Sequence, residues 1–384
     1  MAMAGPLHGI RVIEMAGMGP GPFCGMLLAD MGADVVRIER LAASDRGIDF
    51  PSRFDLLNRN KRSVAINLKS EEGRNSLLRL IGNADALTEG FRPGVMEKLG
   101  LGPDDCLRIN PKLVYGRITG WGQNGPLAPA AGHDVNYIAL AGALHGIGPA
   151  HGKPAVPLNL IGDFGGGALF LAMGMLAAII EARSSGKGQV VDTAMVDGVA
   201  SLMTMQYALL QMGMWKNPRG ENLLDGGAPF YDVYETSDGL HVSVGAVERR
   251  FYEELLERLG LKNETLPKQN DQNGWTRLRE RLAGIFAKRT RDEWCTLLEG
   301  SDACFAPVLS PHEAVTHPHS VARGVYTEVD GVIQPQPAPR FSRTPSSLRN
   351  APPVPGSNTA QTLVDWGFTG DEVARLQALG EVAA

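Results

Sequence analysis

Residues 10–38 read Ile-Arg-Val-Ile-Glu-Met-Ala-Gly-Met-Gly-Pro-Gly-Pro-Phe-Cys-Gly-Met-Leu-Leu-Ala-Asp-Met-Gly-Ala-Asp-Val-Val-Arg-Ile. The apolar run at residues 10–14 predicts a buried strand, and residues 22–31 predict a helix that ends at Gly32. Residues 34–38 predict a second strand. Two short strands joined by a helix are typical of a parallel sheet.

The same alternation continues through the first 120 residues. Short apolar runs at residues 63–68, 84–88 and 113–118 predict further strands, and residues 71–81 and 94–99 predict helices between them. Regular alternation of this kind predicts an α/β fold, with a large Rossmann-like parallel-sheet domain that carries helices on both faces.

Glycine-rich and basic residues follow several of these strands. Parallel sheets bind ligands beyond the carboxyl ends of their strands, where residues 17–21, Arg40 and residues 89–92 fall. Pro20 and Pro22 interrupt the first of these turns, so it is not a GxGxxG motif and we expect no nicotinamide dinucleotide site. The glycines more simply allow a tight turn and close approach of the backbone to a ligand.

The pattern changes beyond residue 225, which indicates a second domain. Residues 231–235 and 241–244 predict a hairpin, and residues 248–259 and 275–288 predict helices. A long Met-rich helix is expected at residues 196–214. We therefore expect a large ligand-binding domain at residues 1–195, a linker helix at 196–224, a small α+β domain at 225–325, and a linker with a C-terminal segment that returns to the large domain at 326–384.

Composition argues against several functional classes. The 384 residues carry a net charge of -5 and are 43% hydrophobic, which gives no reason to expect nucleic-acid or membrane binding. The uncharged run at residues 164–180 is shorter than the ~20 residues that a bilayer needs, so we expect a buried helix there. The four cysteines form no CxxC pair and no signal peptide is evident, which favours reduced thiols and a cytoplasmic location.

Residues 132–137, Gly-His-Asp-Val-Asn-Tyr, place an imidazole beside a carboxylate just before a helix-like apolar run. The positive end of a helix favours the neutral imidazole, so His133 would be held in the form that a base needs. Asp134 could instead serve only to cap that helix through its side chain.

Residues 159–167, Asn-Leu-Ile-Gly-Asp-Phe-Gly-Gly-Gly, place a second carboxylate, Asp163, before the helix expected at residues 168–183. A plain cap does not need three glycines, each of which disfavours helix by ~1 kcal/mol relative to Ala. We interpret the triplet as a place where a ligand carbonyl approaches backbone amides that can stabilise an oxyanion. His133 and Asp163 could then reach opposite faces of one carbon, as moving a proton across a stereocentre requires.

Three further stretches have an ordinary alternative. Glu248 heads a helix of the small domain, where it could orient an imidazole or be a simple first-turn acid. Residues 58–62, Asn-Arg-Asn-Lys-Arg, could meet phosphates together with Arg40 or form a solvated loop. Residues 317–319, His-Pro-His, indicate a loop rather than metal ligands, and the absence of a GxSxG sequence leaves a hydrolase unsupported.

With these residues identified, the chain resembles the family III CoA-transferase superfamily, and most closely its α-methylacyl-CoA racemase branch. In the transferases an aromatic residue usually precedes the position of Asp134, whereas here that residue is His133, as in the racemases. The resemblance runs almost end to end. The stretches that carry it are residues 7–14, 32–39, 92–94, 120–126, 185–189, 225–229 and 339–342.

The resemblance implies a role for each candidate residue. Asp163 matches the second racemase base and Glu248 the acid that contacts the histidine, while Asp134 holds the place of the transferase nucleophile. Lys98 stands where racemases carry arginine, so no bidentate phosphate contact is expected there. The positions that match CoA and substrate contacts are Arg40, Ile66, Asn67, Leu68, Lys69, Gly90, Phe91, Arg92, Lys98, Gly132, Asn136, Tyr137 and Asn159.

The resemblance also implies an interlocked homodimer whose active site lies between the large domain of one chain and the small domain of the other. It implies interconversion of (2R)- and (2S)-2-methylacyl-CoA through an enolate, with no metal and no cofactor beyond the CoA moiety of the substrate. His133 would be the base for one enantiomer and Asp163 for the other, which requires a raised pKa at Asp163. A CoA-transferase that forms an acyl-anhydride on Asp134 is the alternative.

Overall fold

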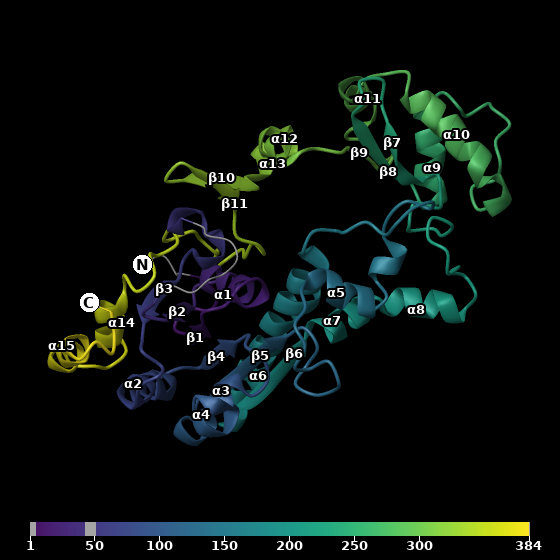
Figure 1. The fold of residues 1–384 in the computed structure, drawn as a ribbon. Helices are drawn as coiled ribbons and strands as arrows, with labels where there is room; N and C mark the ends of the chain where they lie inside the picture. The colour runs from purple at the N-terminus through teal and green to yellow at the C-terminus, as the bar shows by residue number, and fades with distance from the viewer. Residues whose placement is uncertain (1–4, 43–50, 384) are drawn as a thin grey trace. The chain divides into compact units, whose positions relative to one another are not determined.

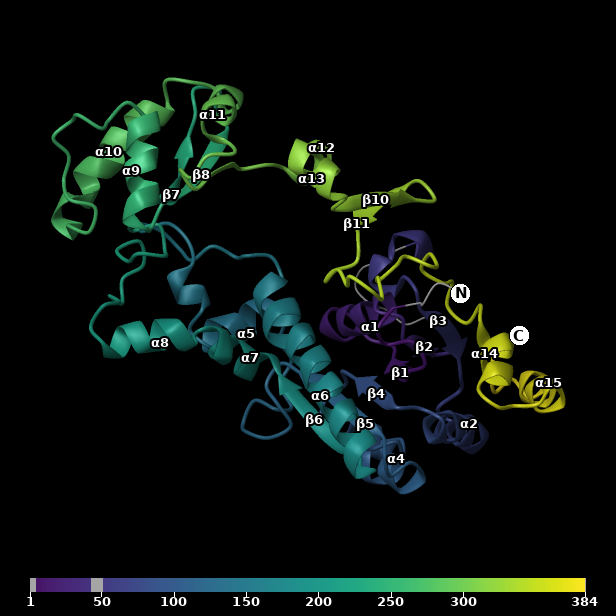
Figure 2. The same cartoon turned by 180° about the vertical axis from the view of Figure 1, so that it is seen from behind.

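The computed structural model describes residues 5–42 and 51–383, which form two compact units. The first unit contains the described parts of Met1–Ala141 together with Leu158–Leu202 and Ala322–Ala384. The second unit contains Gly142–Pro157 and Met203–Val321. Figures 1 and 2 show the elements of each unit from opposite sides.

A six-stranded parallel sheet forms the centre of the first unit. Its strands lie in the order β3-β2-β1-β4-β5-β6, which is the strand order of doubly wound nucleotide-binding sheets. The first five strands each fall on a run predicted as a strand, so the prediction of an α/β fold with a parallel sheet is confirmed. The strands are β1 (Arg11–Met15), β2 (Asp34–Glu39), β3 (Arg62–Ala65), β4 (Ala86–Glu89), β5 (Val114–Thr119) and β6 (Gln189–Ala194).

Both faces of this sheet are buried along β1 to β5, whereas the edge strand β6 is partly exposed, and successive strand residues alternate between the faces. Val12 and Val35 pack on one face with α1 (Pro20–Asp30) and α6 (Leu169–Ser185). Ile13 and Val36 pack on the other face. Burial on both faces explains why the strands read as continuous apolar runs. The helices of the second face are α2 (Glu71–Gly82), α3 (Val95–Lys98), α4 (Pro103–Ile109), α14 (Thr359–Asp365) and α15 (Gly370–Ala378).

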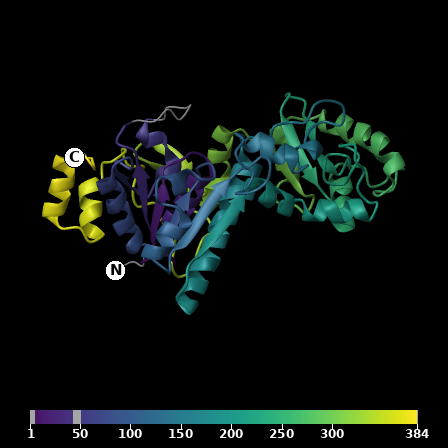
Figure 3. The ribbon, with the colours of Figure 1, turned by 60° about the horizontal axis from the view of Figure 1, so that its bottom comes forward.

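The C-terminal helices close the second face beside β3. Figure 3 shows α14 and α15, in yellow, side by side, and α14 contacts β3. The backbone N–H groups of Ser63 and Ala65 donate to side-chain oxygens of Asn358 and Thr359, at 2.9 and 3.2 Å. These hydrogen bonds fasten the end of the chain to an edge strand of the sheet.

Helix α6 was expected to be buried, but only one of its sides is. Leu171 and Met175 pack against the sheet, whereas Leu169, Met173 and Ile180 are each more than half exposed. With the segment before it, α6 is long and apolar enough to cross a membrane by length and composition alone. Its contacts with β5 and β6 account for the buried side, and an apolar stripe formed by Leu169, Met173 and Ile180 is left uncovered.

The basic cluster predicted at residues 58–62 is neither a phosphate site nor a solvated loop, because residues 58–61 are buried and Arg62, which is partly exposed, pairs with Asp34. Lys61 Nζ donates to Glu14 Oε2 at 2.7 Å, and Arg37 Nη1 donates to Glu14 Oε1 at 3.0 Å. Arg59 Nη2 donates to Asp30 Oδ2 at 2.6 Å. Glu14 lies on β1 and Asp30 on α1, so the cluster fastens this segment to the first strand–helix unit. Buried cations that are paired in this way are not free to meet phosphate.

The second unit is built on an antiparallel sheet. Its strands are β7 (Tyr231–Glu235), β8 (His241–Gly245) and β9 (Phe305–Pro307), in that order. One face of the sheet packs against α9 (Arg249–Arg258), α10 (Trp275–Phe286) and α11 (Arg291–Leu298). The predicted hairpin and the first two of these helices are confirmed, whereas the sequence analysis did not predict α11.

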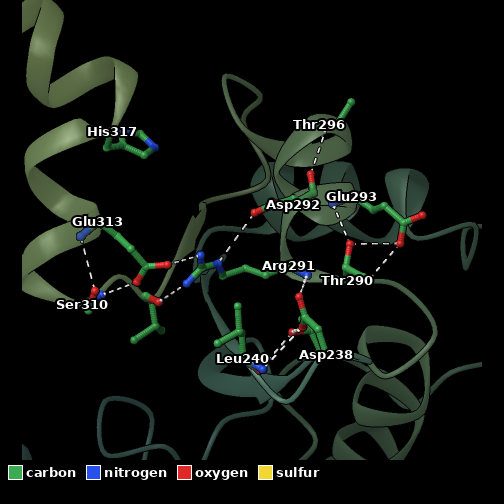
Figure 4. Close-up of polar contacts among 12 residues, drawn as sticks. Asp238, Leu240, Thr290, Arg291, Asp292, Glu293, Thr296, Ser310, Glu313 and His317 are labelled. Carbon is green, nitrogen blue, oxygen red and sulfur yellow. Dashed lines mark hydrogen bonds and ion pairs between the residues drawn. The ribbon is translucent and has the colours of Figure 1, made fainter.

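Arg291 joins the sheet of the second unit to the segment that follows it. Figure 4 shows its guanidinium beside Glu313 of α12 (Pro311–Thr316). Its Nη1 also donates to the Val308 carbonyl at 3.1 Å, and its backbone N–H donates to Asp238 Oδ2 at 3.1 Å. The hydrogen bond from Arg291 lowers the pKa of Glu313 to about 2, so this ion pair persists at neutral pH.

Two boundaries differ from those expected. The helix expected at residues 196–214 is two helices, α7 (Met195–Leu202) and α8 (Thr204–Gln211), because the backbone leaves the helical conformation at Met203. Residues 142–157, expected in the large domain, belong to the second unit. Arg219 holds them there by donating to the carbonyls of His145 and Pro149, at 3.1 and 3.0 Å.

Candidate active site

His133 lies at the start of α5 (Asp134–Leu140), after the loop that follows β5. Its backbone N–H donates to Asn136 Oδ1 at 3.0 Å, which fixes the first turn of the helix. Its side chain is exposed. The structure thus places the imidazole at a helix start, as predicted, and leaves it accessible to a ligand.

Asp134 is buried, and it caps a different helix from the one it begins. Its Oδ2 accepts hydrogen bonds from the backbone N–H groups of Gly162 and Asp163, at 2.6 and 2.7 Å. Both belong to the π-helix η4 (Leu160–Ala168), whose first N–H groups have no acceptor within the helix. A Cβ at Gly162 would lie 2.7 Å from Asp134 Oδ2, so only glycine admits the carboxylate. The interpretation of Asp134 as a cap of α5 is wrong, because its side chain ties α5 to η4.

Asp163 lies in η4 beside the loop between β1 and α1. Its Oδ2 accepts a hydrogen bond from Asn159 Nδ2 at 3.2 Å. A Cβ added at Gly19 would lie 3.1 Å from the same oxygen, so the loop backbone approaches the carboxylate closely. Phe164 stacks on Phe23 of α1, with 4.4 Å between ring centroids. These contacts hold Asp163 beyond the carboxyl end of β1, where such sheets bind ligands.

The pKa of Asp163 is raised, chiefly by its partial burial. The hydrogen bond from Asn159 lowers this pKa, the nearby charge of Asp134 raises it, and the positive charge that His133 can carry lowers it. The raised pKa brings Asp163 closer to the range of an imidazole, as two groups that exchange a proton through one carbon require. The predicted direction is therefore confirmed.

The glycines at residues 165–167 serve helix packing, so their interpretation as a place of ligand approach is wrong. They lie inside η4 rather than before the helix. A Cβ at Gly166 would lie 2.8 Å from the backbone nitrogen of Val199, and a Cβ at Gly198 would lie 1.8 Å from the Gly166 carbonyl oxygen. Val199 and Gly198 belong to α7, so the two helices touch through their backbones.

Replacing Gly198 by alanine is expected to destabilise the protein by about 1–3 kcal/mol or more, because the new methyl group would overlap the Gly166 carbonyl. Gly284→Ala in α10 is the matched control, since a Cβ there meets nothing within 4 Å and alanine favours a helix. Thermal unfolding of both variants checks the expectation. An unchanged unfolding midpoint for Gly198→Ala would contradict the close packing of η4 and α7.

Tyr137 is buried, and it supports the loop before His133 rather than facing a ligand. Its hydroxyl donates to the Gly132 carbonyl, and its ring packs edge-on against Trp121, with 4.8 Å between centroids. Burial and the charges of Asp163 and Asp134 raise the pKa of Tyr137 to about 12, which keeps the hydroxyl protonated as a donor.

Glu248 lies in the second unit, at the residue that precedes α9, and its side chain is exposed. Its carboxylate contributes, after burial, to a raised pKa of the Cys304 thiol. Its contact with His133 stays a prediction.

The residues predicted to bind CoA follow the carboxyl ends of three strands. Arg40 follows β2, residues 66–69 follow β3, and residues 90–92 follow β4. The side chains of Lys69, Arg92 and Lys98 are exposed, and none of them pairs with a carboxylate of the described chain. Ile66 differs, because its side chain is fully buried in the core and only its backbone can face a ligand.

No group of three or more His, Cys, Asp or Glu side chains in residues 5–42 and 51–383 could hold a metal ion. The pair at residues 317–319 is explained locally, because His317 Nε2 contacts Glu299 Oε1 at 3.0 Å.

Two glycines, Gly19 and Gly162, have a role in this site that the sequence analysis did not predict. Each makes room for a carboxylate that comes from elsewhere in the chain, Asp163 and Asp134 respectively. No local pattern could have predicted this role, because it depends on a carboxylate that is distant in sequence.

The fold and the site together define an α/β enzyme with two titratable side chains, His133 and Asp163, beyond the carboxyl ends of its strands. The chain belongs to CoA-transferase family III, whose sequence profile matches residues 7–359. It is 46% identical to the α-methylacyl-CoA racemase of Mus musculus, over 97% of this chain and 96% of the mouse protein. It is 44% identical to the α-methylacyl-CoA racemase of Homo sapiens, over 97% of this chain and 96% of the human protein.

A solved structure extends this comparison to the fold. The crystal structure of a CAIB/BAIF family protein from Brucella suis matches with a TM-score of 0.78 and 26% sequence identity. The match covers 94% of this chain and 100% of the Brucella chain.

Proposed function

We propose that this protein is an isomerase that interconverts the (2R) and (2S) epimers of 2-methylacyl-CoA thioesters. The observation that carries the proposal is the pair of hydrogen bonds from Gly162 and Asp163 to Asp134. Through them the residue next to His133 holds the backbone of Asp163, so one buried carboxylate joins the two proton carriers. The identity of 46% and 44% to two racemases supports the same reaction.

In one direction His133 removes the α-proton and protonated Asp163 delivers a proton to the opposite face of the carbon. The reverse direction exchanges these roles. The α-proton is far less acidic than any side-chain acid, so the intermediate enolate must be stabilised by fixed donors. The first backbone N–H groups of α5, at Asp134 and Val135, have no acceptor within the helix. They can donate hydrogen bonds to the thioester oxygen. The N–H groups of Gly162 and Asp163 already donate to Asp134 Oδ2, so they are not donors for the thioester oxygen.

The pH dependence of the reaction should be bell-shaped, with the same limbs for both enantiomers. Each enantiomer meets a form of the site that carries one proton shared between His133 and Asp163, and these forms are tautomers. Asn159→Ala removes a hydrogen bond that lowers the pKa of Asp163, so we expect the acid limb to move to higher pH. The measurement is kcat/KM against pH for each epimer, with Asn273→Ala in the second unit as control. An acid limb that stays in place would remove Asp163 from the titration.

We propose that the exposed cations Arg40, Lys69, Arg92 and Lys98 meet the phosphates of CoA. They follow strand ends or, for Lys98, lie in the short helix after β4, which suits a nucleotide spread along the carboxyl edge of the sheet. Gly132, Asn136 and Asn159 surround the two proton carriers and would lie near the thioester. The exposed methionines at 205, 212 and 214 suit an adaptable apolar surface for the acyl chain.

We also propose that the protein acts as a homodimer in the cytoplasm. The exposed apolar stripe Leu169, Met173 and Ile180 on α6 is the kind of surface that a second subunit covers. In the interlocked arrangement, Glu248 of the partner subunit would orient His133. The four free cysteines suit a reducing compartment. Sedimentation equilibrium tests the dimer, and a monomer at assay concentrations would contradict it.

A CoA-transferase, the alternative, would need Asp134 as a nucleophile, and the geometry disfavours this. Its Oδ2 accepts two backbone hydrogen bonds, and its Oδ1 is buried without a hydrogen-bond partner in the described chain. Attack through Oδ1 would convert the charged carboxylate into a neutral anhydride, which would weaken the two hydrogen bonds to Oδ2 that hold η4. Hydroxylamine trapping of an acyl group on Asp134 would reveal the transferase reaction.

The test of the proposed function is proton NMR of a single-enantiomer 2-methylacyl-CoA incubated with the protein in deuterated water. We expect loss of the α-proton signal together with appearance of the other epimer. Absence of exchange with several acyl groups would contradict the racemase, and acyl transfer to free acids would then become the leading function.

A further inference from the structure

Arg117 lies at the centre of an ion cluster near the carboxyl ends of β4 and β5, with one buried and one half-exposed carboxylate. Its Nε donates to Glu89 Oε1 at 2.8 Å, and its Nη1 and Nη2 donate to the two oxygens of Glu97 at 2.8 and 3.3 Å. Arg117 is 7% and Glu89 2% exposed, and the two are partners in the register of the adjacent strands. One guanidinium therefore bridges the end of β4 and the helix α3.

The two carboxylates shape the segment predicted to bind CoA. Glu89 Oε2 accepts a hydrogen bond from the backbone N–H of Phe91 at 2.7 Å, which turns the chain directly after β4. Glu97 lies next to Lys98 in α3, and the chain enters α3 through Gly94 at a φ of 82°. Arg117 thus holds both ends of the segment 89–98, which carries Arg92 and Lys98.

We propose that Arg117 is a positioning residue for CoA recognition, which fixes residues 89–98 so that Arg92 and Lys98 present their charges to the phosphates of CoA. This inference rests on the proposed function. Arg117 itself is buried and would not touch the substrate. Its planar fork suits two carboxylates at fixed angles, whereas lysine is a point charge that cannot bridge them in the same way.

The charges of the cluster favour the same role. Glu97 stands beside the segment expected to meet anionic phosphates, and without Arg117 its unpaired carboxylate would repel them. Burial raises the pKa of Glu89, while the Phe91 hydrogen bond and the charge of Arg117 lower it. Loss of Arg117 would therefore favour protonation of Glu89 and weaken the hydrogen bond that turns the chain at Phe91.

The test compares two substrates of the full-length protein. One is a single-enantiomer 2-methylacyl-CoA, and the other is the matching N-acetylcysteamine thioester, which lacks the nucleotide. Arg117→Met should raise KM for the CoA ester, and Kd for free CoA by calorimetry, about ten- to hundredfold. kcat for the CoA ester and kcat/KM for the short thioester should stay near wild type. Arg117→Lys should restore part of the CoA affinity, because it keeps the charge but not the fork.

Two further variants keep the test decisive if Arg117→Met folds poorly. Glu97→Gln removes the ion pair between Arg117 and the half-exposed Glu97. It should raise KM for the CoA ester several-fold and leave KM for the short thioester unchanged. Arg62→Met is the matched control, because Arg62 also bridges two carboxylates from a strand of this sheet, Asp34 and Asp365, but lies far from residues 89–98 in the chain. It should leave both substrates unchanged.

The outcomes separate this inference from the proposed function. If Arg92→Ala weakens CoA binding while Arg117→Met and Glu97→Gln do not, the positioning role is wrong and the CoA site stands. Equal losses for both thioesters in Arg117→Met would likewise overturn it in favour of general destabilisation. A wild-type protein that neither binds CoA nor exchanges the α-proton would instead contradict the proposed function.

Discussion

Replacing Asp163 by asparagine should lower epimerisation by about 10²–10⁴-fold in both directions, as expected for loss of one positioned acid–base group. The amide can neither accept the α-proton nor return one, yet it keeps the size of the carboxylate beside Asn159 and Gly19. The effect of Asp163→Asn on exchange of the α-proton with deuterium should differ between the two epimers. The epimer that His133 deprotonates should still exchange its α-proton with deuterium, and should do so without inversion.

His133→Ala should give the mirror result, with residual exchange confined to the other epimer. Both measurements use proton NMR in deuterated water with one pure epimer at a time. Asp104→Asn is the control, since Asp104 is an exposed carboxylate in the first turn of α4. Equal residual exchange of both epimers in Asp163→Asn would show that one group serves both faces, and the two-base mechanism would fail.

The sheet could be predicted from the sequence because its signal is local. Residues 10–38 contain a complete strand–helix–strand unit, and burial on both faces makes each strand a short apolar run bounded by glycine or a charged residue. The predicted boundaries lie within a few residues of those in the structure. The order of the strands did not follow from the sequence, because it depends on pairing between distant segments.

Some helices were missed although they carry a local signal. Thr290–Glu293 before α11, Ser310–Glu313 before α12 and Thr369–Glu372 before α15 all form capping boxes in the structure. Each has the spacing of a Ser or Thr followed three residues later by Glu. A search for that spacing would have placed these three helix starts from sequence alone.

The interpretations that proved wrong concern residues whose partners are distant in sequence. Asp134 faces η4 rather than the helix it begins, and the glycine triplet at residues 165–167 faces α7. A carboxylate at a helix start and a run of glycines each have several uses. Only the tertiary contact decides among those uses, so the sequence named the important residues but not their roles.

The cluster at residues 58–61 illustrates the same limit for charge. Four positions rich in basic and amide side chains resemble a phosphate site or a solvated loop, yet all four are buried. Their counter-charges, Glu14 and Asp30, lie some thirty to fifty residues earlier in the chain. Glu14 itself lies in a strand that reads as an ordinary apolar run. No local pattern therefore predicts its pairing with Lys61.

Replacing Lys61 by methionine should destabilise the first unit by about 3–5 kcal/mol, the typical cost of breaking a buried ion pair by removing one partner. Lys61, Arg37, Glu14 and Glu39 form a buried set with two charges of each sign, so the variant leaves an excess negative charge. Lys61 Nζ also donates to the Pro22 carbonyl at 2.9 Å and to Asn58 Oδ1 at 3.1 Å, and both acceptors would lose that donor. Thermal unfolding followed by calorimetry measures the change.

The neighbouring residue supplies the control for this prediction. Arg62 pairs with Asp34 and Asp365, but these side chains are 22% to 44% exposed, so Arg62→Met should cost only about 0–1 kcal/mol. Glu14→Gln added to Lys61→Met restores the charge balance and should recover part of the lost stability. Similar effects of Lys61→Met and Arg62→Met would show that solvent reaches the cluster. In that case phosphate as well as water would have access to the cations at residues 58–61.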